Sequence, residues 1–365
     1  MSQPLYLEVY QRLRDAIHSG AYRVGDRMPA EAELTKQLGV SPITLKRAMD
    51  LLRDDGYVTR RPRLGTVVVS ETATTAVAAR KGPAPLIGCV LTEFDDTFGT
   101  RVLAGLLDAS GSAAHLVVKR SLGDRAAEGE LVRSLVADGV TGLILEPSSS
   151  QYVAPAVLEL LTQSFPVVIL DRVFDGVPVS SVCSDNVAAG SKAAEALFAA
   201  GHEHVGLVSA STAVSTVQDR LDGVVAAHAT RHVPFDPARQ FREVRSTVPG
   251  SGVAPDDDVV ELEKFLAAHP EVTGLVATEY KIAVLLREAA QRAGRTVPDD
   301  LGIVCFDHPE AFYDQAQYRF THVRQDEARM GSEAVALVLA QLRGSAAVTK
   351  VALPTELVPG SSTRG

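Results

Sequence analysis

The chain has no tryptophan, only three cysteines and four methionines, and no long apolar run in its 365 residues. No uninterrupted apolar stretch reaches about 18 residues, which excludes a membrane-spanning helix. The polar amino terminus lacks a basic segment followed by an apolar one, which excludes a signal peptide. Cys89, Cys183 and Cys305 lie in or beside apolar runs without metal-site spacing, so we expect buried, reduced thiols. These absences predict a cytoplasmic protein with no membrane partner.

Charge is distributed unevenly along the chain. Residues 1–70 contain 11 Lys/Arg and 8 Asp/Glu, a balance of +3, whereas the remaining residues contain 25 and 37, a balance of −12. The net charge of −9 excludes a uniformly basic nucleic-acid coat. Because a local basic surface attracts a polyanion, the amino-terminal segment is the candidate for a nucleic-acid contact.

The first 70 residues have the pattern of three helices and a two-stranded hairpin. Apolar residues recur at helical spacing in the first segment, and a glycine ends it. Ser41-Pro42 begins a helix well, because serine can cap free N–H groups and proline is tolerated at the first helical position. We expect helices over 6–17, 30–38 and 41–55, and strands over 57–60 and 66–69.

The outer face of the third expected helix suits the major groove of DNA. Hydroxyl and basic side chains hold phosphates, and arginine can read guanine edges with two hydrogen bonds. The hairpin adds arginines beside a glycine tip, suited to backbone or minor-groove contact. A solvated helix with ordinary surface charges is the alternative. The predicted DNA-binding residues are Ser41, Pro42, Ile43, Thr44, Lys46, Arg47, Arg60, Arg61, Arg63 and Gly65.

Over residues 4–70 this pattern resembles the GntR-type winged helix-turn-helix regulators. The matching segments are Pro4–Tyr6, Met28–Leu34, Val40–Ala48, Gly56–Val58 and Gly65-Thr66. The resemblance implies double-stranded operator DNA as a partner. Ala32 and Pro42 stand where the family frequently has arginine, so Lys46 and Arg47 would carry more of the sequence reading.

Beyond residue 85, apolar β-like runs alternate with helical segments. This alternation predicts an α/β fold with parallel sheets covered by helices on both faces. About 280 residues suit two lobes better than one. The expected strands cover 86–91, 116–118, 142–145, 167–170, 205–208, 274–277, 302–306 and 351–353.

We therefore expect three parts: a DNA-binding domain over 1–70, a linker over 71–85 and a two-lobed domain over 86–365. The linker is rich in alanine and threonine and ends with two prolines, although a helix over 74–80 is an alternative. One lobe is expected to comprise 86–183 with 308–342, and the other 184–307 with 343–360.

Polar side chains follow the expected strands at their carboxyl ends, where open α/β sheets bind ligands. Carboxylates recur there, and Arg172 and Arg220 lie nearby in the sequence. Such groups can hold the hydroxyls of a polyol, while Phe98 supplies an apolar wall. The alternative is that the acidic residues only stabilise the positive ends of the following helices.

The ordered motifs over 86–360 resemble the LacI-type sensor domain, which is related to periplasmic sugar-binding proteins. They include Ile87-Gly88, 138–145, 166–172, 220–223 and Val323-Arg324-Gln325. The resemblance implies a homodimer and a sugar effector, with a nucleoside or another polar metabolite as the alternative. Thr278-Glu279 departs from the Asn-Asp frequent in the family. The implied effector contacts are Asp96, Phe98, Arg172, Asp185, Arg220, Glu279, Asp307 and Gln325.

The combination resembles the arabinose-utilisation repressors, which join the same two parts. It predicts a ligand-responsive bacterial regulator, a repressor, that binds a pseudo-palindromic operator as a dimer. We predict no metal and no cofactor, because His202 and His204 have no third ligand at metal-site spacing.

A carbohydrate-active enzyme and a cytoplasmic sugar-binding protein of the transport type are the alternatives from other classes. The sequence has no Gly-x-Ser-x-Gly motif and no Walker-type phosphate loop, and the acidic residues form no identifiable proton-transfer pair. The attached DNA-binding pattern opposes a transport protein. We therefore predict that the protein is not an enzyme.

Overall fold

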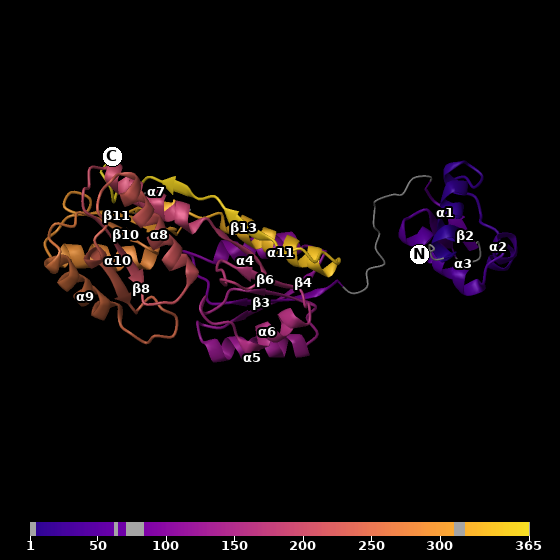
Figure 1. The fold of residues 1–365 in the computed structure, drawn as a ribbon, viewed down its shortest axis with the longest axis horizontal. Helices are drawn as coiled ribbons and strands as arrows, with labels where there is room; N and C mark the ends of the chain where they lie inside the picture. The colour runs from indigo at the N-terminus through magenta and orange to yellow at the C-terminus, as the bar shows by residue number, and fades with distance from the viewer. Residues whose placement is uncertain (1–4, 62–64, 71–83, 310–317, 365) are drawn as a thin grey trace. The chain divides into compact units, whose positions relative to one another are not determined.

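The computed structural model describes residues 5–61, 65–70, 84–309 and 318–364. The chain divides into two compact units, Met1–Ala84 and Pro85–Gly365 (Figure 1). Most of the expected linker lies outside the described residues. Within the described ranges, no helix is both long and apolar enough to cross a membrane.

The first unit packs three helices against an antiparallel hairpin, which confirms the winged helix-turn-helix pattern. Ile17, Leu34, Leu45 and Leu52 are buried in its core. Gly39 has a φ of 65°, the left-handed conformation that glycine adopts without steric cost, and it ends the second helix. The elements are α1 (Leu5–His18), α2 (Glu31–Leu38), α3 (Pro42–Asp54), β1 (Val58–Arg61) and β2 (Gly65–Val68).

The second unit contains two six-stranded sheets, one in each lobe, which confirms the predicted α/β fold. The first sheet is wholly parallel, in the order β13-β7-β6-β5-β3-β4. Its strands are β3 (Leu86–Leu91), β4 (His115–Arg120), β5 (Gly142–Leu145), β6 (Val167–Leu170), β7 (Ser180–Ser184) and β13 (Lys350–Leu353).

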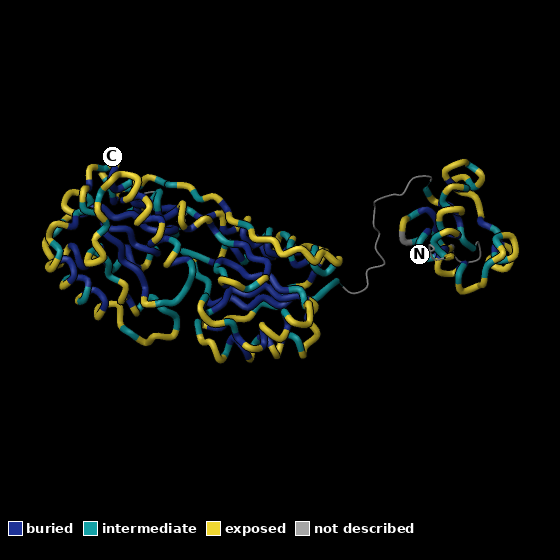
Figure 2. The backbone as a smooth tube through the Cα atoms, viewed as in Figure 1, coloured by how far each residue is buried: buried dark blue, intermediate teal, exposed yellow. Residues whose placement is uncertain are grey.

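The second sheet has the order β14-β12-β11-β10-β8-β9 and is parallel except for the pair β12–β14. Figure 2 shows that buried residues concentrate in the strands of both sheets. The strands are β8 (Val205–Ala210), β9 (Gln240–Val244), β10 (Gly274–Ala277), β11 (Gly302–Phe306), β12 (Thr321–Arg324) and β14 (Glu356–Val358).

Helices cover both faces of each sheet. In the first lobe α4 (Thr100–Ser110) and α11 (Glu327–Leu342) pack on one face, and α5 (Arg125–Ala137) and α6 (Pro155–Thr162) on the other (Figure 1). In the second lobe α7 and α8 share one hydrophobic core, and α9 and α10 share another. Their bounds are α7 (Asn186–Ala199), α8 (Ser215–Thr230), α9 (Pro255–Ala268) and α10 (Tyr280–Arg292).

Two segments belong to the lobe opposite to the one predicted for them. Strand β12 pairs with β11 in the second lobe, whereas 308–342 was expected in the first. Strand β13 pairs with β7 in the first lobe, whereas 343–360 was expected in the second. The chain therefore crosses between the lobes after β7, after β12 and after β13.

All three cysteines are free thiols. Cys89 and Cys305 are buried, as expected, whereas Cys183 is partly buried. Burial raises the pKa of the Cys89 thiol to about 12, so this thiol stays protonated and unreactive at neutral pH.

Candidate functional site

The outer face of α3 is exposed along its first two turns. The side chain of Ser41 accepts a hydrogen bond from the Thr44 backbone N–H at 3.2 Å, which caps the helix as the sequence predicts. Ile43 is 80% exposed, so its apolar side chain is available for contact with a partner. Lys46 and Arg47 are also exposed, and Thr44 is half-buried.

An aromatic ring supports Arg47. Its guanidinium carbon lies 4.9 Å from the centre of the Tyr6 ring on α1, a cation–π contact that restrains the side chain while leaving it exposed. The first helix therefore positions a predicted DNA-reading side chain of the third.

Beside the wing, which is the hairpin of β1 and β2, lies one basic residue that the sequence analysis did not predict, Arg27. Arg60 is exposed on β1, and Gly65 opens β2 with a φ of 83°. The Arg27 side chain fills the space beside Gly65, with Nε 3.3 Å from where a Cβ would stand. Arg63 lies outside the described residues, and only the backbone of Arg61 is described. Arg27 precedes α2, so only the folded hairpin reveals its place.

A cavity of about 190 Å³ lies between the two lobes at the carboxyl ends of their strands. Six of the eight predicted effector contacts line it: Phe98, Arg172, Arg220, Glu279, Asp307 and Gln325. The structure thus brings together residues from both lobes and from segments that follow several strands of each sheet.

Two predicted contacts do not line this cavity. Asp96 is exposed, and its neighbour Asp95 lines the cavity instead. Asp185 caps α7 by accepting a hydrogen bond from the Ala188 N–H at 3.0 Å. Its carboxylate therefore stabilises the start of a helix, which is the alternative that the sequence left open for the acidic residues.

In the first lobe, Arg172 is held between two carboxylates. Its guanidinium Nη2 lies 3.2 Å from Glu146 Oε1 and its Nε 3.9 Å from Asp171 Oδ2. Burial raises the pKa of both carboxyls, and the charge of Arg172 opposes the shift. Among the described residues, Asp171 Oδ1 and Arg172 Nε have no hydrogen-bond partner. These atoms are suited to a ligand, such as a hydroxyl group, that both donates and accepts hydrogen bonds.

In the second lobe, hydrogen bonds from two of its nitrogen atoms hold Arg220 in place. Its Nε donates to Asn186 Oδ1 at 2.9 Å and its Nη1 to the Thr278 carbonyl at 2.6 Å. Its guanidinium carbon lies 3.9 Å from the centre of the Phe306 ring. These contacts fix the orientation of the buried cation at the cavity wall.

A close helix crossing brings Arg220 to this place. A Cβ on Gly190 of α7 would lie 2.1 Å from the Arg220 carbonyl oxygen of α8, so only glycine allows the two backbones to approach. The close crossing of α7 and α8 therefore positions Arg220 at the cavity, in addition to packing the core.

Asp307 and Gln325 form a hydrogen-bonded pair beside Arg220. Gln325 Nε2 donates to Asp307 Oδ2 at 2.6 Å, and Gln325 Oε1 accepts from Ser184 Oγ at 2.7 Å. Burial raises the pKa of Asp307 to about 6, although Arg220 opposes the shift. Asp307 and Asp171 have φ values of 58° and 62°, a strained conformation for aspartate that is typical of functional sites.

The cavity lining is acidic overall. Six carboxyl groups line it, from Glu93, Asp95, Glu146, Asp171, Glu279 and Asp307, against the three cations of Arg172, Arg220 and Lys281. Such a lining opposes an anionic ligand and suits a neutral molecule with several hydroxyl groups, because hydroxyls donate to carboxylates and accept from guanidinium groups.

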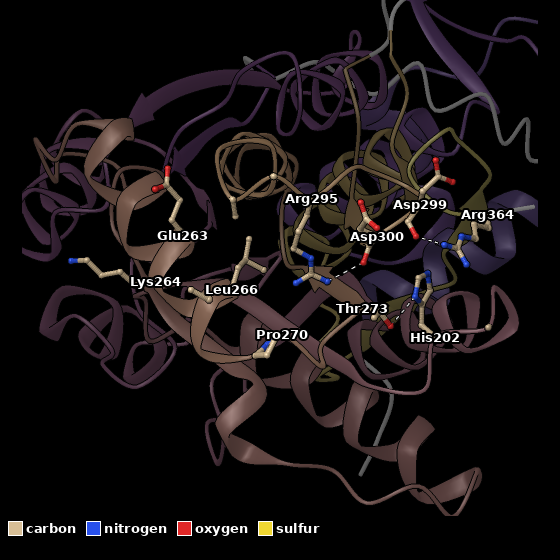
Figure 3. Close-up of a pocket in the computed structure, with 14 residues that line it drawn as sticks. His202, Glu263, Lys264, Leu266, Pro270, Thr273, Arg295, Asp299, Asp300 and Arg364 are labelled. Atoms are coloured by element: carbon tan, nitrogen blue, oxygen red, sulfur yellow. Dashed lines mark hydrogen bonds between the residues drawn. The ribbon is translucent and has the colours of Figure 1, made fainter.

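A larger hollow of about 1010 Å³ lies in the second lobe, at the amino-terminal ends of its strands (Figure 3). Some of its polar groups are bonded to one another, whereas buried atoms of His202, Glu263 and Arg295 have no hydrogen-bond partner among the described residues. Arg295 Nη2 donates to the Asp300 carbonyl at 2.9 Å, and His202 Nδ1 lies 3.1 Å from Thr273 Oγ1. Arg364 donates to the Asp299 carbonyl. None of the eight predicted effector contacts lines this hollow, whereas six line the cavity between the lobes, which is therefore the better candidate.

Comparison with known proteins supports the two-part architecture. The chain is 24% identical over 375 residues to the arabinose metabolism transcriptional repressor of Geobacillus stearothermophilus, covering 99% of this chain and 98% of the relative. It is 25% identical over 337 residues to the ribose operon repressor of Bacillus subtilis (strain 168), covering 89% and 96%.

A solved structure shares the fold of the second unit. The LacI family transcriptional regulator from Enterococcus faecium with bound ribose superimposes with a TM-score of 0.62 at 20% identity, covering 76% of this chain and 98% of that one. Residues 5–68 match the family described as bacterial regulatory proteins, gntR family, and residues 194–363 match the periplasmic binding protein-like domain. The chain therefore carries a GntR helix-turn-helix domain joined to a periplasmic binding protein-like domain.

Proposed function

We propose that the protein is a ligand-responsive transcriptional regulator that binds double-stranded operator DNA and a small polar effector. The observation that carries the proposal is the pairing of an exposed basic helix face with a separate two-lobed unit that encloses a polar cavity. Relatives over nearly the whole chain are named repressors of sugar operons, which supports repression and binding in place of catalysis.

The DNA contacts follow from the geometry of the winged helix. The exposed face of α3 enters the major groove, where Lys46 and Arg47 contact phosphates and base edges. Ser41, Pro42, Ile43 and Thr44 complete this face. Arg60, Arg61, Arg63 and Gly65 of the wing, with Arg27 beside them, contact the adjacent backbone or minor groove.

The effector is a neutral sugar bound in the cavity between the lobes. The cavity, about 190 Å³, is smaller than the roughly 300–1,000 Å³ of pockets that hold drug-sized ligands, so it suits a small metabolite. Phe98 faces an apolar side of the sugar, and the charged residues bind its hydroxyls. The contacts we propose are Asp95, Phe98, Glu146, Asp171, Arg172, Arg220, Glu279, Asp307 and Gln325.

Effector binding in the cavity changes the affinity of the homodimer for DNA. A homodimer places two winged helices on a pseudo-palindromic operator, and closure of the lobes around the effector alters their spacing. A coupling of roughly 1–3 kcal/mol changes affinity about 5–150-fold, and DNA changes effector affinity by the same factor. This mechanism requires that the protein is located where it has access to DNA.

Two variants separate the two activities. Arg47→Ala weakens operator binding and leaves effector binding unchanged, because Arg47 lies in the first unit. Arg220→Lys keeps the buried charge but loses the two-point contact to Asn186 and Thr278, so it weakens effector binding and spares DNA binding by the free protein. DNA retardation measures operator binding, and a thermal-shift screen of neutral sugars measures effector binding. Loss of both activities in either variant, with an unchanged melting temperature, contradicts the assignment.

A further inference from the structure

Ile43 has the most exposed large apolar side chain among the described residues. It is 80% exposed, whereas the next two, Val24 and Leu5, are 54% and 53% exposed. The buried side of α3 is provided by other residues, such as Leu45 and Leu52, which pack in the core of the first unit. Folding of this unit therefore does not account for an isoleucine at position 43.

The first turn of α3 holds the Ile43 side chain in a fixed direction. Pro42 occupies the first helical position, and Ser41 Oγ caps the turn at the Thr44 N–H. The hydroxyls of Ser41 and Thr44 also lie 2.8 Å apart and hydrogen-bond to each other. A β-branched side chain has one strongly preferred rotamer in a helix. Ile43 therefore presents an ordered apolar surface, and little side-chain entropy is lost when a partner covers it.

The surroundings of Ile43 are positively charged. The exposed Arg47 lies four residues further along α3, and residues at this spacing are neighbours on one helix face. Lys46 precedes it and is also exposed, and the first turn of α3 contains no acidic residue. The amino-terminal end of a helix adds a partial positive charge. An apolar protein surface would have to desolvate these charges, whereas a nucleic acid neutralises them, so the charge around Ile43 favours DNA as its partner.

We propose that Ile43 contacts the 5-methyl group of a thymine in the operator and makes binding depend on that base. The inference rests on the proposed function, because it takes α3 to lie in the major groove. There thymine is the base that carries a methyl group, whereas purines present hydrogen-bonding atoms. Burying an apolar side chain against a purine edge leaves those atoms without a partner, which costs free energy, and burying it against a methyl group gains free energy.

The contact divides the recognition of DNA between two kinds of side chain. Lys46 and Arg47 bind by charge and release counterions from the DNA, so their contribution falls as the salt concentration rises. Ile43 carries no charge, so its contribution does not change the salt dependence. It discriminates one base pair through a single methyl group, and this distinguishes Ile43 from a residue that only supports the helix.

Deoxyuridine tests the contact, because it differs from thymidine only by the missing 5-methyl group. Full-length protein first selects a duplex from a random library. Retardation titrations then compare the selected duplex with versions in which one thymine of each half-site is replaced by deoxyuridine. At one thymine position, the replacement weakens binding by the wild-type protein about fourfold for each methyl group removed, the factor expected for one buried methyl group.

Variants of Ile43 show whether this side chain reads the methyl group. Ile43→Ala binds the thymine duplex at least about fourfold more weakly, and deoxyuridine causes it no further loss. Its salt dependence is that of the wild-type protein. Ile43→Val keeps a branched apolar side chain and retains part of the preference for thymine. Val24→Ala is the matched control, because Val24 is an exposed apolar residue of the same unit that lies outside α3, and it keeps the full wild-type preference.

Two results overturn the contact while leaving the proposed function intact. In the first, deoxyuridine at no position weakens binding by the wild-type protein. In the second, it weakens binding by Ile43→Ala as much as binding by the wild-type protein, so that another side chain reads the methyl group. Failure of the full-length protein to select any duplex overturns the proposed function as well. Because Ile43 is exposed, thermal unfolding of Ile43→Ala should match that of the wild-type protein.

Discussion

Lys281 and Asp95 join the two lobes directly, with Lys281 Nζ 2.6 Å from Asp95 Oδ2 at the wall of the central cavity. Asp95 follows β3 of the first lobe, and Lys281 lies on α10 of the second. Burial acts to raise the pKa of Asp95, but hydrogen bonds from Lys281 and Thr97 outweigh it and hold the pKa at about 2. The pair is therefore an ion pair throughout the physiological pH range.

Replacing Lys281 changes how stability depends on pH. The folded pKa of Asp95 is below its unfolded value of about 3.9, so its contribution is complete above pH 4 and is lost as the pH falls towards 2. Lys281→Met reduces this contribution, by less than about 1 kcal/mol because both side chains are partly exposed. Urea unfolding at pH 3 and pH 6 measures the difference.

Lys264→Met is the control for this change, because Lys264 pairs with Glu261 at 2.7 Å within a single helix. It should leave the acid dependence as in the wild-type protein. An unchanged acid dependence in Lys281→Met would show that the pair across the lobes does not hold Asp95 ionised.

Asp307 predicts the opposite pH dependence. Burial raises its folded pKa to about 6, above the unfolded value, so the unfolded chain releases this proton first. Its contribution to stability therefore falls as the pH rises from 4 to 6, by roughly 2–4 kcal/mol in total. Asp307→Asn should make the decline between pH 4.5 and pH 7 smaller while still accepting from Gln325, as urea unfolding would show. Glu327, whose pKa burial raises to about 7, contributes to the decline that remains. An identical decline in the variant would assign it to another group.

The approach of α7 to α8 predicts a sharp difference between two glycine substitutions. Gly190→Ala places a Cβ 2.1 Å from the Arg220 carbonyl oxygen and should cost about 1–3 kcal/mol of stability while displacing Arg220. Gly129→Ala in α5 meets its nearest atom at 3.8 Å and should be neutral, or stabilising by up to about 1 kcal/mol through helix propensity. Thermal unfolding compares them. Equal effects would mean that the helices can separate without cost.

Arg27 should contribute to DNA binding through the phosphate backbone. Its side chain lies beside the wing, so Arg27→Ala is expected to weaken binding to all sequences and to lower the salt slope by about 1. Arg14→Ala is a suitable control, because Arg14 pairs with Asp15 on α1 at 2.9 Å. Retardation titrations at several salt concentrations measure both slopes. Equal slopes for the two variants would remove Arg27 from the interface.

Most of the fold could be predicted because its central strands are buried on both faces and read as apolar runs. The 167–170 and 142–145 segments are examples. Strands β7, β9, β12 and β14 were missed because polar or charged residues interrupt their apolar character, as in Thr321–Arg324. Since β12 and the pairing of β13 set where the chain crosses between lobes, the lobe boundaries were misplaced with them.

The residues of the candidate site could be predicted only where they directly follow a predicted strand. Arg172 and Asp307 follow buried strands directly, so their place at the cavity follows from the fold. Asp95 and Asp96 lie in a loop, and the turn selects between them: Asp95 Oδ1 accepts from the Thr97 N–H at 2.8 Å. Such local hydrogen bonding is not encoded in the spacing of the acidic residues.

The central claim is that one protein couples DNA binding to an effector in the cavity between its lobes. A retardation titration of full-length protein on its own upstream DNA, with and without the sugar that raises its melting temperature, tests it most directly. The account predicts that saturating sugar changes operator affinity by about 5–150-fold. An operator affinity that is the same with and without bound sugar would contradict it.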